Sequence, residues 1–159
     1  MRISLQFTFL LITLTVGSAG VRAENLKYAH DTLDQFHLAA SRADAEIYFG
    51  LFTKDAVFLG TDATERWPIA EFIKFATPYY EAGTGWTYVK TERHINVSAD
   101  GQHASFDELL DNKSYGLCRG TGVLRLVEGK WKIEQYHLTI PIPNEIAKNV
   151  VEQIRGLAP

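Results

Sequence analysis

Four alternating segments in the second half of the chain constrain the fold more than any other feature. Gly85 to Asp111 is typical of two strands joined at a turn, Ala99-Asp100-Gly101, and Ser114 to Pro143 is typical of two more. The second pair is joined at Glu128-Gly129. Turn residues between alternating runs are typical of β-hairpins. The pattern predicts an antiparallel meander whose apolar face must pack on another layer.

Helical periodicity before the meander supplies that layer. Glu24 to about Arg42 carries apolar residues at helical spacing, with Asp44 as the cap of a second, short helix. Asp55 to Gly60 is a short apolar strand, and Pro68 then opens a third helix in its first turn, with Pro78 helping to end it. The three predicted core faces are Ala29, Leu33, Phe36 and Ala40; Ile47, Tyr48, Leu51 and Phe52; and Ile69, Phe72, Ile73 and Ala76.

A helical tail follows the last predicted strand. Asn144 can cap it, and Ile146, Val150 and Ile154 share one face. The element order is therefore α-α-β-α-β-β-β-β-α. No internal repeat or linker interrupts it, so we expect one α+β domain over residues 24–159, with a sheet that curls around its helices.

Residues 1–23 are typical of a secretory signal peptide rather than of the fold. Arg2 provides a positive start, Ile3 to Val16 is apolar, and Val21-Arg22-Ala23 offers small residues where a signal peptidase reads. The alternative is an uncleaved anchor, but the run is short for a bilayer core of about 30 Å. We expect cleavage after Ala23 and a secreted, periplasmic protein without a membrane span.

Charge and cysteine content exclude several classes. Cleavage would remove two of the 16 basic residues and leave 14 against 19 acidic ones, without a basic patch, which argues against nucleic-acid binding. Cys118 is the single cysteine. It predicts either a buried thiol on a strand or a disulfide between subunits, so packing must stabilise the chain itself.

Three segments in this order resemble the SnoaL-like branch of the nuclear transport factor 2-like superfamily. They are Ala39 to Trp67, Gly85 to Asn112 and Arg119 to Asn144, and together they cover most of the mature chain. The resemblance implies a cone of helices and a strongly curved antiparallel sheet around a pocket, and a homodimer as the default assembly. Members use the pocket for isomerisation, dehydration, cyclisation, subunit assembly or ligand binding, so fold does not fix function.

The catalytic residues of well-understood relatives do not carry over. In the ketosteroid isomerase-like branch an Asp base, a Tyr and a protonated Asp would fall at Gly60, Phe36 and near Gly122. Asp62 is the one residue near enough to replace that base. The pocket arginines of the related kinase association domains correspond to Gly122 and Leu138, which puts that anion-binding chemistry in doubt.

One carboxylate and one guanidinium are predicted to point inwards. Glu108 shares a strand face with Ala104, Phe106 and Leu110, and a carboxylate there must be paired, hydrated or protonated. Arg93 interrupts an apolar set on the preceding strand and could pair with Glu108. Such a pair is more often structural than catalytic. The alternatives for Glu108 are a place at the rim, or Asp107 facing inwards instead.

The loop from Thr61 to Trp67 and the last hairpin supply the remaining candidates. Trp67 could wall the pocket and Asp62 could act as base, or they could only pack on a helix and cap a turn. The facing of His137 depends on the Glu128-Gly129 turn. A two-residue turn sets His137 opposite Gly120, on the face of Trp131 and Ile133, and a bulged turn sets it opposite Arg119.

Glycines on the third strand of the meander leave empty volume. Gly116, Gly120 and Gly122 share a face with Cys118. They make room for a ligand or allow the sheet to bend sharply, and the second reading is favoured in a curved sheet.

Histidines and short motifs indicate neither a metal nor a cofactor. His37 lies one position from the apolar helix stripe, His30 lies seven residues earlier, and Asp34 with His37 is too common a pair to count. Motifs of serine hydrolases, redox enzymes and nucleotide-binding proteins are missing from the sequence.

Three functions remain open. The first hypothesis is a domain that binds a small, partly apolar molecule. The second is a cofactor-free acid–base enzyme, with His137, Asp62 or Glu108 moving a proton. The third is a structural or assembly domain. The predicted ligand-facing residues are Trp67, Tyr48, Phe72, Arg93, Glu108, Arg119 and His137.

Overall fold

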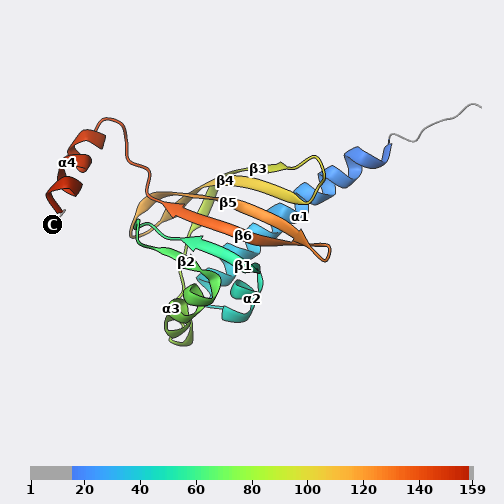
Figure 1. The fold of residues 1–159 in the computed structure, drawn as a ribbon, viewed down its shortest axis with the longest axis horizontal. Coiled ribbons are helices and arrows are strands. Elements are labelled where there is room, and N and C mark those ends of the chain that lie inside the picture. The colour runs from blue at the N-terminus through green and yellow to red at the C-terminus, as the bar shows by residue number, and fades with distance from the viewer. Residues whose placement is uncertain (1–15, 158–159) are drawn as a thin grey trace, which may run out of the picture.

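The computed structural model describes residues 16–157 as an α+β domain with a six-stranded sheet. The sheet order is β2-β1-β6-β5-β4-β3, with β1 and β6 parallel and all other neighbours antiparallel (Figure 1). The strands are β1 (Phe52–Leu59), β2 (Arg66–Pro68), β3 (Val89–Val97), β4 (His103–Asn112), β5 (Gly116–Val127) and β6 (Lys130–Thr139). The helices are α1 (Val16–Ser41), α2 (Ala45–Gly50), α3 (Ile69–Glu81) and α4 (Ala147–Leu157).

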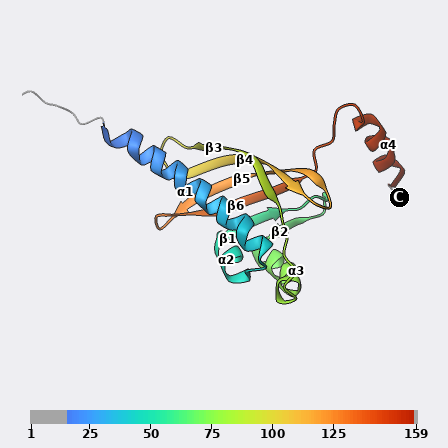
Figure 2. The same ribbon diagram turned by 180° about the vertical axis from the view of Figure 1, so that it is seen from behind.

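The helices α1, α2 and α3 lie on one side of the sheet. Figure 2 shows α1 crossing the strands obliquely, with α2 and α3 gathered at its C-terminal end. The predicted α1 stripe of Ala29, Leu33, Phe36 and Ala40 is entirely buried, which confirms that face. Residues 1–15 of the predicted signal peptide lie outside the described residues, and 16–23 form the start of α1. Cleavage and export therefore stay predictions.

The second and third helices follow the predicted pattern with four corrections. Asp44 caps α2, because its Oδ1 accepts a hydrogen bond from the Ile47 amide at 3.1 Å. Ile47 itself is exposed. Phe52 belongs to β1, because α2 already ends at Gly50. Pro68 precedes α3 as its cap, and Pro78 lies within α3, which continues to Glu81.

A bulge in β6 decides which side chains face the helices. Glu128 and Gly129 form the predicted two-residue turn, both with positive φ. The pairing then shifts, from Leu124 opposite Ile133 to Val123 opposite Gln135, which leaves Glu134 as the extra residue. Trp131 and Ile133 are buried before the shift, and Tyr136 and Leu138 are buried after it. One inserted residue therefore exchanges the two faces of the strand.

The C-terminal helix stands away from the body of the domain (Figure 1). It begins at Ala147, close to the predicted cap at Asn144, but none of its residues is buried. Ile146 and Ile154 of the predicted apolar face are more than half exposed.

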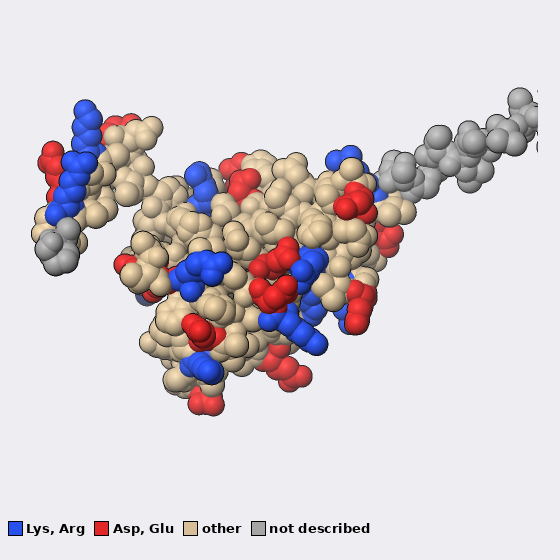
Figure 3. All heavy atoms as spheres, viewed as in Figure 1, with Lys and Arg blue, Asp and Glu red and all other residues tan. Residues whose placement is uncertain are grey.

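Within residues 16–157, no helix combines the length and apolar character that a bilayer crossing needs. Acidic and basic side chains alternate on the face shown in Figure 3.

Candidate functional site

An aromatic cavity of about 220 Å³ lies between the three packed helices and the sheet. Ten aromatic or histidine rings line it, supplied by α1, α2, α3, β1, β6 and the segments before β3 and β5. Phe58 and Phe72 stack at 4.0 Å between ring centroids, and Phe58 also stacks on Tyr136. The lining residues are Phe36, His37, Ala40, Tyr48, Phe58, Gly60, Thr61, Glu65, Phe72, Phe75, Trp86, Tyr88, Tyr115, Tyr136 and Leu138.

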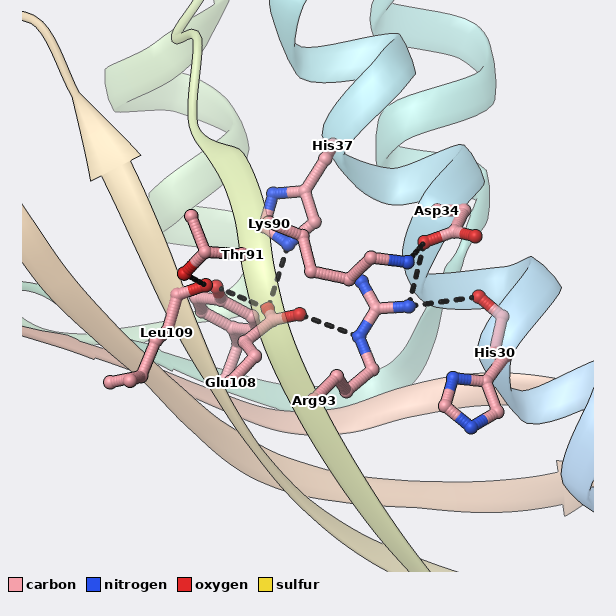
Figure 4. A network of polar contacts seen from close by, with 9 residues as sticks. His30, Asp34, His37, Lys90, Thr91, Arg93, Glu108 and Leu109 are labelled. Carbon is pink, nitrogen blue, oxygen red and sulfur yellow. Dashed lines mark hydrogen bonds and ion pairs between the residues drawn. The ribbon is translucent and has the colours of Figure 1, made fainter.

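Glu108 is the centre of a buried polar network behind this cavity. Its side chain is inaccessible to solvent and accepts three hydrogen bonds from three different elements. His37 Nε2 on α1 and the Tyr136 hydroxyl on β6 lie 2.7 and 3.0 Å from Oε1, and Arg93 Nε on β3 lies 2.7 Å from Oε2. Figure 4 shows His37 and Arg93 approaching the carboxylate from different sides. The carboxylate is therefore both buried and fully paired.

The strand pattern places Glu108 in this position. Glu108 shares the inward face of β4 with Ala104, Phe106 and Leu110, all buried, as the sequence predicts. Arg93 is its direct neighbour on β3, which confirms the predicted pair. Gly120 is its neighbour on β5. A Cβ at Gly120 would overlap the Tyr136 hydroxyl and come within 2.9 Å of Glu108 Oε1, so this glycine makes room for the network.

The network holds Glu108 in its charged form. Burial by itself raises the pKa of Glu108, but its close contacts with His37 and Arg93 outweigh burial. The pKa of Glu108 therefore lies below its ordinary value. Burial and the neighbouring Glu108 charge raise the pKa of Tyr136 well above the phenol value, so Tyr136 is a hydrogen-bond donor at neutral pH.

Further polar contacts fix the side chain of Arg93. Arg93 has a side chain only 1% exposed, and its Nη1 donates to Asp34 Oδ1 at 2.7 Å and to the His30 carbonyl at 3.2 Å. Lys90 also contacts Asp34, at 2.8 Å. Two cations thus balance two carboxylates, and the α1 backbone is tied to β3 (Figure 4). Rigid attachment of this kind orients a functional side chain.

His37 connects the network to the cavity. Glu108 is ionised and can only accept, so Nε2 of His37 must carry the hydrogen. In the neutral ring Nδ1 is then the acceptor nitrogen, and within residues 16–157 no hydrogen bond to Nδ1 is found. His37 lines the cavity while only 9% exposed. His37 is therefore held in place by Glu108 at the edge of the cavity.

The family follows from the sequence once this geometry is clear. Residues 29–143 match the model of the SnoaL-like domain. The chain belongs to the SnoaL-like family. The predicted cone fold is confirmed, because the structural neighbours are NTF2-like proteins with a cystatin-like fold. No curated protein matches the sequence.

Solved structures similar to this SnoaL-like domain share its fold at low identity. A protein of unknown function from Mycobacterium tuberculosis is 15% identical, with a TM-score of 0.64, over 89% of this chain and 90% of that one. A candidate dehydratase of the NTF2-like family from Streptomyces avermitilis is 16% identical, with a TM-score of 0.66, over 77% and 99%. A candidate scytalone dehydratase from Novosphingobium aromaticivorans is 10% identical, with a TM-score of 0.64, over 78% and 89%.

The predicted ligand-facing residues separate into three groups. Tyr48 and Phe72 line the cavity of the SnoaL-like domain. Arg93 and Glu108 lie behind it and act on it through His37 and Tyr136. Trp67, Arg119 and His137 do not line it.

The loop after β1 places a different acid at the cavity from the one expected. Asp62 is exposed, and its Oδ1 accepts hydrogen bonds from the Thr64 amide at 2.8 Å and the Thr64 hydroxyl at 2.6 Å. These bonds lower the pKa of Asp62 and make it a turn residue. Glu65 lines the cavity instead. Trp67 stacks on Phe75 at 5.2 Å, outside the lining set.

Both expected registers for His137 are wrong, although the predicted turn is present. The bulge in β6 sets His137 opposite Thr121 and Arg119 opposite Thr139. Arg119 is exposed and His137 is half-buried on the face away from the cavity lining. Tyr136 takes the inward position that His137 would have in the first of the two expected registers.

Sequence reasoning missed His37, Tyr136 and Glu65. His37 lies four residues after Leu33 and three before Ala40, both buried, so its place within the apolar stripe was a usable signal. Its partner is 71 positions away, which a helical pattern cannot reveal.

Cys118 is a buried thiol, as one of the two alternatives proposed. Within the described residues, no three His, Cys, Asp or Glu side chains gather as metal ligands would.

Proposed function

We propose that this SnoaL-like domain is a cofactor-free acid–base enzyme of the isomerase or dehydratase type. His37 is the residue that moves the proton, and the substrate is a small ring compound held in the aromatic cavity. The observation that carries the proposal is the 2.7 Å hydrogen bond between His37 Nε2 and the buried Glu108 carboxylate. It leaves Nδ1 as the basic nitrogen in a cavity with an otherwise largely apolar lining.

Cavity size and lining support a ring compound. A cavity of about 150 Å³ is enough to hold benzene, and this one is larger, at about 220 Å³. Its walls include Phe36, Phe58, Phe72 and Trp86, whose flat faces suit a planar or nearly planar molecule. Few polar groups converge on an apolar pocket of this kind, which is the usual composition of a small-molecule site.

The roles follow from the contacts. His37 Nδ1 takes a proton from a carbon next to a carbonyl, and the ring becomes an imidazolium whose charge faces Glu108. The same nitrogen returns the proton to a second position or to a leaving hydroxyl. Glu108 is a positioning residue, because it fixes the tautomer and orientation of His37 but does not line the cavity. Arg93 and Tyr136 hold Glu108 in turn.

Hydrogen exchange on a model ketone tests the proposal without knowledge of the natural substrate. The purified protein is incubated with α-tetralone in D₂O, and loss of the α-proton signal is followed by NMR. The wild type should accelerate exchange, and His37→Gln should lose about 10²–10⁴-fold of that rate, the usual contribution of a general base. Gln keeps a donor for Glu108. His103→Gln, at an exposed position of β4, is the matched control and should leave exchange unchanged.

The outcomes separate the candidate functions. Equal exchange in wild type and His37→Gln would overturn the role of His37. Binding of α-tetralone, seen as a change in tryptophan fluorescence, without any exchange would favour a ligand-binding domain. Neither binding nor exchange with any ring ketone would favour an assembly role, for which the size of the protein in solution is the direct measurement.

A further inference from the structure

A buried hydroxyl without a partner lies next to the cavity. Tyr80 on α3 is 5% exposed, and within residues 16–157 its hydroxyl makes no hydrogen bond. Buried hydroxyl groups are nearly always paired, so an unpaired one requires an explanation. Burial raises the pKa of Tyr80 well above the phenol value, so the group is a neutral donor with nothing to receive its hydrogen.

Tyr48 lies between this hydroxyl and the cavity. The Tyr48 and Tyr80 ring centroids are 5.3 Å apart, and Tyr48 lines the cavity from α2. Burial raises the pKa of Tyr48, and the neighbouring Tyr80 hydroxyl raises it further, so the two phenol groups are close. Tyr48 in turn lowers the pKa of Tyr80, so the two hydroxyls lie within reach of each other. Of the two, the Tyr80 hydroxyl is the one without a partner for its hydrogen in the described part of the chain.

The pair shares a wall with the proposed base. Tyr48 stacks on Phe36 with 4.8 Å between centroids, and Phe36 meets His37 edge to face at 5.1 Å. Tyr48 and His37 thus both contact one phenylalanine ring, and both line the same cavity. A molecule of one or two rings lying on Phe36 can contact both of them.

We propose that Tyr48 and Tyr80 form an oxygen-recognition site, which selects ring compounds that carry a carbonyl or phenolic oxygen. Tyr48 donates to the ligand oxygen, and Tyr80 donates to the Tyr48 oxygen, so the second bond strengthens the first. The Tyr80 hydroxyl then has a role, because its hydrogen bond supports the Tyr48 hydroxyl when Tyr48 donates to the ligand oxygen. Negative charge that develops on that oxygen during proton transfer is stabilised by the same donors.

This inference rests on the proposed function, because it concerns the substrate that binds in the same cavity. It adds the substrate class and orientation: the oxygen points towards α2 and α3, and the reacting carbon lies towards His37 on α1. It also assigns Tyr48 as the residue that touches the ligand and Tyr80 as a positioning residue behind it.

A matched pair of probes tests the site independently of any proton transfer. Affinities for 2-naphthol and naphthalene are measured by fluorescence titration, since the two differ by one hydroxyl. The wild type should bind 2-naphthol at least tenfold more tightly. Tyr48→Phe should remove that preference while the naphthalene affinity stays within twofold, and Tyr80→Phe should reduce the preference in part.

Control variants and outcomes complete the test. Tyr79→Phe, at an exposed neighbour of Tyr80 outside the lining set, should keep the full preference. Thermal melts show whether each variant folds, and Tyr80→Phe, which removes an unpaired group, should fold at least as well as the wild type. An equal preference in wild type and Tyr48→Phe, or no preference in the wild type, would overturn the inference. The α-tetralone exchange would still report on His37 alone.

Discussion

Glu108 on β4 and His37 on α1, 71 positions apart in the chain, are joined by a hydrogen bond of 2.7 Å. The bond links the sheet to the helix that crosses it, and it orients the histidine at the cavity. Arg93 and Tyr136 complete the set of donors around the same carboxylate. Glu108 therefore serves both the stability of the fold and the geometry of the candidate site, and variants at this residue should affect both.

Glu108→Gln should destabilise the protein strongly. The amide fills the same volume but leaves the Arg93 guanidinium, whose side chain is 1% exposed, without its buried counter-charge. Loss of one partner of a buried pair costs about 3–5 kcal/mol. Urea unfolding gives the free energy directly. Glu134→Gln is the control, since Glu134 pairs with Arg125 at a partly exposed position, where the loss should stay below about 1 kcal/mol. Similar losses in the two variants would contradict this account.

Stability should fall in acid in a way that depends on Glu108. Its pKa is lowered in the folded protein from an ordinary value of 4.5, so the unfolded chain binds the proton more readily. The stabilisation is fully present above pH 4.5 and is lost as the pH falls through the lower folded pKa. In urea titrations between pH 7 and pH 2, the difference between wild type and Glu108→Gln should therefore shrink towards low pH. In the background of the surface variant Asp62→Asn, the Glu108→Gln substitution should give the same shrinking difference, because Asp62 bonds to Thr64 and not to the Glu108 network. A constant difference between wild type and Glu108→Gln would show that another group is responsible.

The sequence predicts the architecture well because local patterns determine it. The meander, the Asp44 cap, the buried α1 stripe and the inward face of β4 each follow from spacing within one element. The pairing of Arg93 with Glu108 follows too, because both interrupt apolar faces of adjacent strands. Two opposite charges that both point into an apolar core have few partners other than each other.

The site is harder to predict because it depends on one inserted residue and on contacts between distant elements. Glutamate is not a residue type that marks a bulge, so nothing in the sequence points to Glu134. The bulge nevertheless places Tyr136 on the inward face instead of His137. The packing of Tyr136 against Glu108 and the space left by Gly120 favour that register, and both are tertiary effects. His37 was visible beside the apolar stripe, but only the placement of β4 brings it to Glu108.

Gly120→Ala should disturb the network from the opposite strand. A Cβ there overlaps the Tyr136 hydroxyl, and such overpacking typically costs about 1–3 kcal/mol. Tyr136→Phe removes the overlapping atom, so the double variant should be more stable than the sum of the two single losses predicts. Unfolding free energies of the four proteins in this cycle measure the coupling. Gly50→Ala is the control, because a Cβ at Gly50 meets nothing within 4 Å. Additive losses in the cycle would place the strain elsewhere.

Deletion of residues 144–159 should leave the stability of the domain unchanged. None of the α4 residues is buried, and the helix stands away from the sheet in Figure 1. An element that buries no apolar surface contributes little to the free energy of unfolding. Thermal melts of the full chain and the shortened chain should therefore coincide within about 1 °C, as expected for a change well below 1 kcal/mol. A lower melting temperature after deletion, particularly one that depends on protein concentration, would show that the apolar residues Ile146 and Ile154 pack against a second copy of the chain in solution.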